Sequence, residues 1–180
     1  MGASELDRLR EQLRGEVRAA LGGVEGAIKA WLDMLLSTEL MCDVDALHLE
    51  VFPDGFDRGV PVQAFWLDAD NNEVFCRTPE GKWIPPSPAQ TSPRVRGTLV
   101  STQRVDEYQA LAPALPVLEV MGNECVEYLA GLVRTSEVSP KFRVTAGLHD
   151  EDAVVLCEAS GGPETLLRAR THHLRARIVL

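Results

Sequence analysis

Apolar residues recur at intervals of three and four along the first 35 positions of the chain. They are Leu6, Leu9, Leu13, Val17, Ala20, Val24, Ala27, Trp31, Met34 and Leu35. This spacing predicts an amphipathic helix, because such steps place side chains on one helical face. Ser4, followed by Asp7 three positions later, is close to the capping pair that begins many helices. Gly22 and Gly23 each disfavour a helix by about 1 kcal/mol, so we expect one kinked helix or two helices that break there.

The period of the pattern changes to two after position 46. Single residues separate the apolar side chains of Leu47, Leu49 and Val51, which predicts a half-buried strand that ends at the turn residues 53–55. Residues 60–67 are apolar on both faces, as in a central strand.

Strand-like sequence resumes at residues 74–78, beyond the polar segment 68–72, as an antiparallel partner for residues 60–67. A turn at residues 79–82 then leads into Trp83 and Ile84. Together these segments predict an antiparallel β-meander.

The second half of the chain begins with a surface loop over residues 85–93, which contain four prolines and no apolar period. Residues 95–102 are expected to form a further strand. Helical spacing returns over residues 105–112 and 117–133, with prolines between them. Alternation at residues 142–148 and an apolar run at residues 153–159, joined by a polar turn, predict a hairpin.

The last segment allows two interpretations. Pro163 after two glycines, with Glu164 in the first turn, favours a helix, whereas a turn at His172 and His173 would make a hairpin. In both cases the pattern predicts a single α+β domain over residues 1–180: an antiparallel β-meander packed with a long N-terminal helix and further helices in the C-terminal half. Residues 1–40 are the first helix packing on the sheet or a helical arm, and their heptad-like phase also allows a homodimer through the N-terminal helix.

Composition indicates an ordinary folded protein, since 45% of the 180 residues are hydrophobic and 25% are charged. No stretch reaches the roughly 18 apolar residues that a membrane span requires, and the N-terminus lacks the pattern of a secretory leader. We therefore expect a cytoplasmic protein without a membrane partner. The four cysteines are more than 30 positions apart and form no C-x-x-C pair, so we expect reduced, buried thiols rather than a disulfide or a zinc site.

The net charge of −9 is unevenly distributed: residues 41–160 carry 19 acidic and 9 basic side chains, whereas residues 161–180 carry 1 and 4. An acidic surface repels nucleic-acid phosphates and attracts basic proteins, so nucleic acid is not expected as a partner. Eight carboxylates lie between positions 43 and 73, interleaved with phenylalanines. The candidate binding residues in this segment, an acidic rim with an aromatic anchor, are Asp54, Phe56, Asp57, Asp68 and Asp70.

Asp68, Asp70 and Asn72 alternate as at the start of a calcium loop. Such a loop needs glycine at its sixth position and a bidentate glutamate at its twelfth, where this chain has Glu73 and Pro79. Asp and Asn also favour tight turns. We therefore expect a hairpin turn and no metal.

Candidate catalytic residues are two pairs of histidine and glutamate. His48 and Glu50 share one face of the predicted strand, and His149 and Glu151 repeat that spacing in a turn. A histidine and a carboxylate can position a general base or share a metal; the alternative for each is a solvated surface side chain. No nucleophile elbow, phosphate loop or dinucleotide fingerprint occurs, and no cofactor is expected.

The sequence therefore favours a non-catalytic cytoplasmic protein-binding domain, such as an inhibitor or immunity-like protein, that holds a basic protein on its acidic surface. The alternative is a small hydrolase, or a protein that binds a metal or small molecule, using the pairs His48/Glu50 and His149/Glu151.

Overall fold

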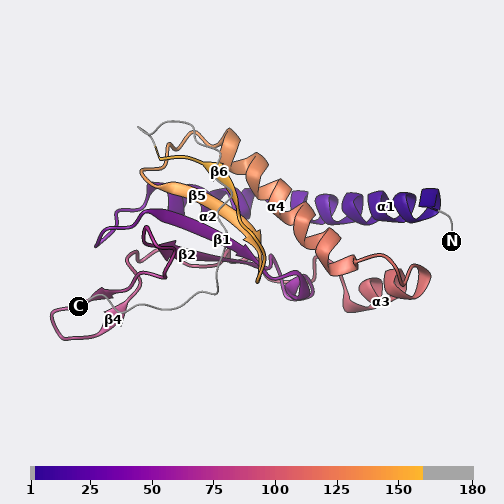
Figure 1. Cartoon of the computed structure of the whole chain (residues 1–180), viewed down its shortest axis with the longest axis horizontal. Helices are drawn as coiled ribbons and strands as arrows, with labels where there is room; N and C mark the ends of the chain where they lie inside the picture. Colours follow the sequence, from indigo (N-terminus) through magenta and orange to yellow (C-terminus); the bar gives the residue numbers. More distant parts are fainter. Residues whose placement is uncertain (1–2, 160–180) are drawn as a thin grey trace.

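The structure of this chain, a computed structural model, describes residues 3–159. In this range the chain forms four α-helices and a four-stranded sheet, which confirms the predicted α+β class (Figure 1). The C-terminal segment, for which the sequence allows a helix or a hairpin, lies outside the described residues. None of the helices in the described range is long and apolar enough to cross a membrane.

The N-terminal helix breaks where the glycines predict. α1 (Ala3–Gly22) and α2 (Glu25–Ser37) are separated at Gly23 and Val24. The break shifts the apolar phase, because Ala27 and Met34 are exposed in α2. The buried side chains of the two helices are Leu9, Leu13, Val17 and Leu21 in α1, and Ile28, Trp31, Leu32, Leu35 and Leu36 in α2.

The apolar stripe of α1 packs against α4 (Val117–Thr135) of the same chain. Ion pairs reinforce this contact: Glu124 is 1% exposed and accepts from Arg14 Nε at 2.8 Å, while Arg18 Nη2 lies 2.6 Å from its other oxygen. α1 therefore packs within its own domain. A homodimer through this helix stays a prediction, but most of the α1 part of the stripe that motivates it is already buried within the chain.

The sheet is mixed. Its order is β2 (Val62–Leu67), β1 (Ala46–Val51), β5 (Arg143–Leu148), β6 (Val154–Cys157). β1 is antiparallel to β2 but parallel to β5, because α3 (Thr102–Leu111) and α4 lie between the two central strands in the chain. The predicted hairpins β1–β2 and β5–β6 are present. Within the described residues, the predicted meander continues beyond β2 only through a single antiparallel bridge between Leu67 and Glu73, and the sequence pattern does not predict the parallel pairing of β1 with β5.

β3 (Cys76–Arg77) and β4 (Trp83–Ile84) do not join the sheet. They form a separate two-stranded ribbon, drawn at the lower left of Figure 1. The strand predicted over residues 95–102 is wrong: Gly97 has a φ of +114°, and the backbone amides of Leu99 and Val100 both donate to the Phe56 carbonyl rather than to a neighbouring strand. This segment is a loop against residue 56, close to the short 3-10 helix η1 (Pro53–Gly55).

The two faces of the sheet differ in chemistry. In register, Leu47, Leu49 and Val51 align with the apolar residues of β2 and β5 and join the core with the helices. The intervening residues, His48 and Glu50, point to the opposite face, since successive side chains of a strand alternate. Phe65 and Thr145 flank His48 on that face, and Gln63 flanks Glu50.

The segment after β2 is the predicted turn. Asp68 Oδ1 accepts hydrogen bonds from the backbone amides of Asp70 at 2.9 Å and Asn72 at 2.8 Å. Asn71 adopts a φ of +62°, which Asn tolerates better than most residues. The carboxylate of Asp68 thus stabilises a tight turn, as its sequence indicates.

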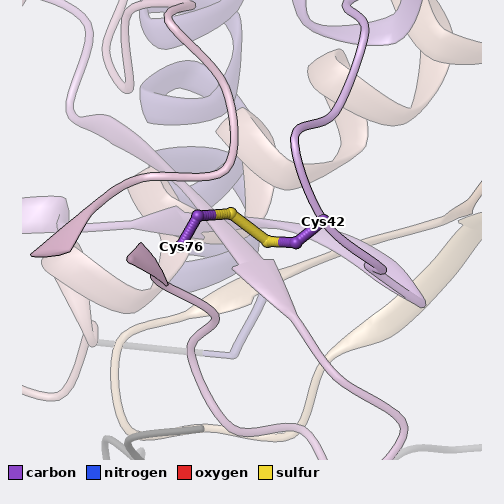
Figure 2. Close-up of a disulfide and its surroundings, with 2 residues drawn as sticks. All are labelled: Cys42 and Cys76. Atoms are coloured by element: carbon purple, nitrogen blue, oxygen red, sulfur yellow. A yellow bond between two sulfur atoms is a disulfide. The ribbon is translucent and has the colours of Figure 1, made fainter. Parts of the chain in front are cut away.

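The expectation that all four cysteines are reduced is wrong. Cys42, in the segment between α2 and β1, is joined to Cys76 of β3 by a disulfide (Figure 2). These residues are 34 positions apart in the sequence, and they meet because the ribbon folds back onto residues 38–45. Of the other two, Cys125 is buried, as predicted, and Cys157 is half-buried.

Candidate functional site

Glu50 and His149 meet at the end of the parallel pair β1–β5. Val51 aligns with Leu148, so His149 follows β5 at the same edge of the sheet where β1 ends. The Nδ1 atom of His149 lies 2.5 Å from Oε1 of Glu50. The structure thus brings together one residue from each predicted pair, which are 99 positions apart.

The environment of this contact favours a charged histidine. The Glu50 side chain is 5% exposed and that of His149 is 50% exposed. The hydrogen bond to Glu50, with the nearby charges of Asp150 and Asp54, raises the pKa of His149 above its ordinary value. Nε2 lies 3.5 Å from Asp150 Oδ2, and the Phe52 ring centroid is 4.8 Å from the imidazole centroid. The His149 ring therefore lies between carboxylates and beside an aromatic ring.

His48 shares the sheet face with Glu50, as its spacing predicts, but it is not a solvated side chain. It is 4% exposed, and its Nδ1 atom lies 3.0 Å from the Thr145 hydroxyl on the neighbouring strand. Burial lowers its pKa to about 4, so the ring is neutral near pH 7. Glu151, the fourth candidate, is exposed, and its amide donates to the Leu148 carbonyl in the turn.

The described residues contain no group of three or more His, Cys, Asp or Glu side chains placed to hold a metal ion. A pocket of about 380 Å³ is lined by Phe52 and Gln63 among others, but by neither Glu50 nor His149. Phe52 contacts His149 and Gln63 is the strand neighbour of Glu50. The arrangement can hold a proton at His149, and the pocket is connected to it only through these two neighbouring residues.

The predicted acidic binding residues divide between opposite ends of the β1–β2 hairpin. Asp54 and Asp57 follow β1, whereas Asp68 and Asp70 follow β2. Since β1 spans six residues, the two ends are about 20 Å apart. Phe56 is 1% exposed and belongs to the core, so it does not lie on the surface as an anchor must.

At the β1 end, Arg58 pairs with Asp54 and Asp57. Its guanidinium lies 3.3 Å from Asp57 Oδ1 and 3.6 Å from Asp54 Oδ2. The turn after β5, with Asp150, Glu151 and Asp152, lies at this same end, because β5 runs parallel to β1. The other end is also rich in carboxylates. We call it the acidic end: residues 38–45, the turn 68–73 and the β3–β4 ribbon with the first residue of β5.

Contacts between these segments make the acidic end one structure. The Asp45 amide donates to the Leu67 carbonyl at 2.9 Å, and the Met41 amide donates to the Pro86 carbonyl at 2.8 Å. The Cys42–Cys76 bond ties the ribbon to the same loop (Figure 2). Its carboxylates are Glu39, Asp43, Asp45, Asp68, Asp70, Glu73 and Glu80, and its basic residues are Arg77, Lys82 and Arg143.

Two large apolar side chains are exposed at the acidic end. Met41 is 53% exposed and Trp83 is 37% exposed. The guanidinium of Arg77 lies 5.9 Å from the Trp83 ring centroid. Trp, Met and Arg are enriched in protein interfaces. Local sequence could not identify this group, because the disulfide and a ribbon of two-residue strands bring Met41 and Trp83 to one end.

Comparisons with protein families, with curated proteins and with solved structures find no match to this chain. Its function is therefore inferred from these two sites.

Proposed function

We propose that this chain is a protein-binding domain that holds a basic protein at its acidic end. The observation that carries the proposal is the exposure of Met41 and Trp83 among carboxylates, on segments joined by the Cys42–Cys76 bond. An inhibitor of a basic enzyme, as an immunity-like protein would be, is the role that this chemistry suits.

The two kinds of side chain would contribute differently. Aromatic and Met anchors contribute most when a partner removes them from water. The exposed carboxylates of Asp43, Asp45 and Asp70 would steer a basic surface toward them and speed association. Binding should therefore weaken as salt rises, since exposed charges are screened within about 10 Å at 0.1 M salt.

The test compares charge reversal at the two ends of the hairpin. One variant carries Asp43→Lys and Asp70→Lys, with Asp45→Lys added in a second variant; the control, which matches the first in net charge, carries Asp54→Lys and Asp57→Lys at the β1 end. Each protein is immobilised and exposed to a lysate of the source cells, and retained proteins are quantified by mass spectrometry.

We expect the wild type and the control to retain the same basic protein, and the acidic-end variants to retain about tenfold less of it. Trp83→Ala should reduce retention of that protein as well, without changing net charge. If the acidic-end variants retain the protein as well as the wild type does, the proposed surface is wrong.

A second candidate function is acid–base chemistry at Glu50 and His149. The specific observation is the 2.5 Å contact between a buried carboxylate and a half-exposed imidazole. A buried carboxylate that orients a histidine is a common device of general acid–base catalysis. It ranks second because Asp150 Oδ2 already lies 3.5 Å from the Nε2 atom that would face a substrate.

A ligand-shift melting screen tests this candidate. A small molecule that raises the melting temperature of the wild type but not of Glu50→Gln or His149→Gln would support it. Equal shifts for all three proteins would remove it.

A further inference from the structure

We propose that the Cys42–Cys76 bond is a redox-controlled brace of the acidic end. Its reduction by a dithiol releases the β3–β4 ribbon and carries Trp83 away from Met41, so that the binding surface is complete only in the oxidised protein. The release of the ribbon is a property of the fold; its effect on binding rests on the proposed function.

The ribbon has few other attachments. Its strands pair only through Cys76 with Ile84 and Arg77 with Trp83, and a ribbon this short is not stable in water by itself. Within the described part of the chain, the hydrogen bonds of residues 75–85 join ribbon residues only to one another. The nearest hydrogen bonds to the rest of the domain flank the ribbon. Before it, the Val74 amide donates to the Trp66 carbonyl, and after it, the Met41 amide donates to the Pro86 carbonyl.

The bond is placed for selective exchange. Cys42 and Cys76 are both half-buried, so the bond is not enclosed in the core. The free thiols compete poorly as nucleophiles: burial raises the pKa of Cys125 to about 12 and also raises that of Cys157. Reduction therefore acts on the 42–76 bond without reshuffling it to the other two cysteines.

The chemistry is thiol–disulfide exchange. A thiolate of the dithiol attacks one sulfur of the bond and forms a mixed disulfide, and its second thiol displaces the remaining cysteine. Two electrons and two protons pass to Cys42 and Cys76, which become thiols, while the dithiol is oxidised to a disulfide.

The rate of tryptic cleavage reports release of the ribbon directly, because Arg77 and Lys82 are exposed within it. Dithiothreitol-treated protein should be cut at these two residues at least about tenfold faster than oxidised protein. The Cys42→Ser/Cys76→Ser variant should be cut at the fast rate with or without the dithiol. Cleavage at the exposed Arg58 is the internal reference, and hydrogen exchange of residues 143–148 shows that the domain stays folded. Unchanged cleavage at Arg77 and Lys82 in reduced, folded protein would show that the disulfide does not hold the ribbon in place.

Binding is measured with a synthetic peptide of alternating arginine and leucine residues as the probe. We expect the oxidised wild type to bind it at least about fivefold more tightly than the reduced protein or the double serine variant. Fast cleavage with equal affinity in both forms would overturn redox control of the surface. If instead Asp43→Lys/Asp45→Lys/Asp70→Lys has wild-type affinity, the proposed function fails, while the cleavage rates still decide whether the bond braces the ribbon.

Discussion

His48 and His149 should respond to pH in opposite directions, because His48 is desolvated by burial and His149 accepts stabilisation from a contacting carboxylate. Burial lowers the pKa of His48 to about 4, whereas the unfolded chain should titrate near its ordinary value of about 6.5. Below about pH 6.5 the unfolded state therefore binds a proton that the folded state does not. Stability is full above that pH and falls as the pH falls toward 4, where the loss levels off at about 3 kcal/mol.

We predict that His48→Gln removes this acid sensitivity. Between pH 7.5 and 4.5 the wild type should lose about 2.5 kcal/mol more unfolding free energy than the variant does, as measured by urea denaturation. The carboxylates titrate in both proteins, so the difference isolates His48. Parallel pH profiles for the two proteins would show that His48 is not held neutral in the fold.

We predict the reverse for His149. Its pKa is raised chiefly by the hydrogen bond to Glu50, so its stabilising effect is fully present below about pH 6.5 and is lost as the pH rises through the raised folded value. Glu50→Gln should lower the pKa of His149 toward its ordinary value, as followed by NMR titration of the ring. Asp150→Asn is the matched control and should lower it less, since that carboxylate is at 3.5 Å. A pKa that stays raised in Glu50→Gln would mean that the surrounding charges, and not this contact, cause the shift.

The residues of the candidate site are only partly predictable from sequence. The alternation of β1 is enough to predict that His48 and Glu50 share a face of the sheet. It cannot predict that His149 reaches Glu50, because this contact depends on the parallel pairing of β1 with β5. The two strands are separated by more than 90 positions that include α3 and α4, and local alternation carries no information on which strands become neighbours.

At the scale of elements, α4 approaches the sheet closely at one glycine. A Cβ atom on Gly122 would lie 2.5 Å from Leu148 Cδ2 and 3.0 Å from Pro53 Cγ, whereas one on Gly131 of the same helix would have nothing within 4 Å. Leu148 is itself buried, so it has little room to move. Gly122 thus lets α4 pack on the end of β5 and on η1, next to the residues that carry His149.

We predict opposite effects for alanine at these two glycines. Gly122→Ala should destabilise the domain by about 1–3 kcal/mol through overpacking. Gly131→Ala should stabilise it by up to about 1 kcal/mol, because alanine favours a helix and meets no neighbour there. Urea denaturation of both variants checks this. Equal effects would show that α4 can shift away from β5 at little cost.

Much of the element pattern follows from sequence, and the exceptions have physical causes. The helix break at Gly23 and the hairpins β1–β2 and β5–β6 are local features, which spacing and turn residues can indicate. The β3–β4 ribbon is too short for its alternation to show which sheet it joins. Residues 95–100 are apolar enough for a strand, but Gly97 and the contact with Phe56 direct them into a loop.

For the whole molecule, the distribution of charge is predictable only in part. Composition identifies the acidic segment, but the antiparallel β1–β2 pair places Asp54 and Asp57 at one end and Asp68 and Asp70 at the other. The acidic end is assembled by a disulfide between residues 34 positions apart. Such a pairing is set by the folded arrangement of the chain, which cysteine spacing alone does not reveal.

The same disulfide should stabilise the whole domain, because it closes a long loop in the unfolded chain. Loop-closure entropy predicts that a bond across 34 positions contributes about 2–4 kcal/mol. We predict that Cys42→Ser/Cys76→Ser lowers the unfolding free energy by this amount in urea denaturation, and that dithiothreitol lowers that of the wild type equally but leaves the variant unchanged. Cys157→Ser, which removes a free thiol, is the matched control and should not reproduce the loss.

The size of this loss of unfolding free energy also tests whether the disulfide holds the β3–β4 ribbon in place. A ribbon that is released in the native state gains conformational freedom there, which offsets part of the loop entropy, so the loss should fall in the lower half of that range. If the variant loses as much as the full loop entropy predicts and its ribbon still resists trypsin, the ribbon stays in place without the bond. The disulfide would then stabilise the fold without controlling the acidic end.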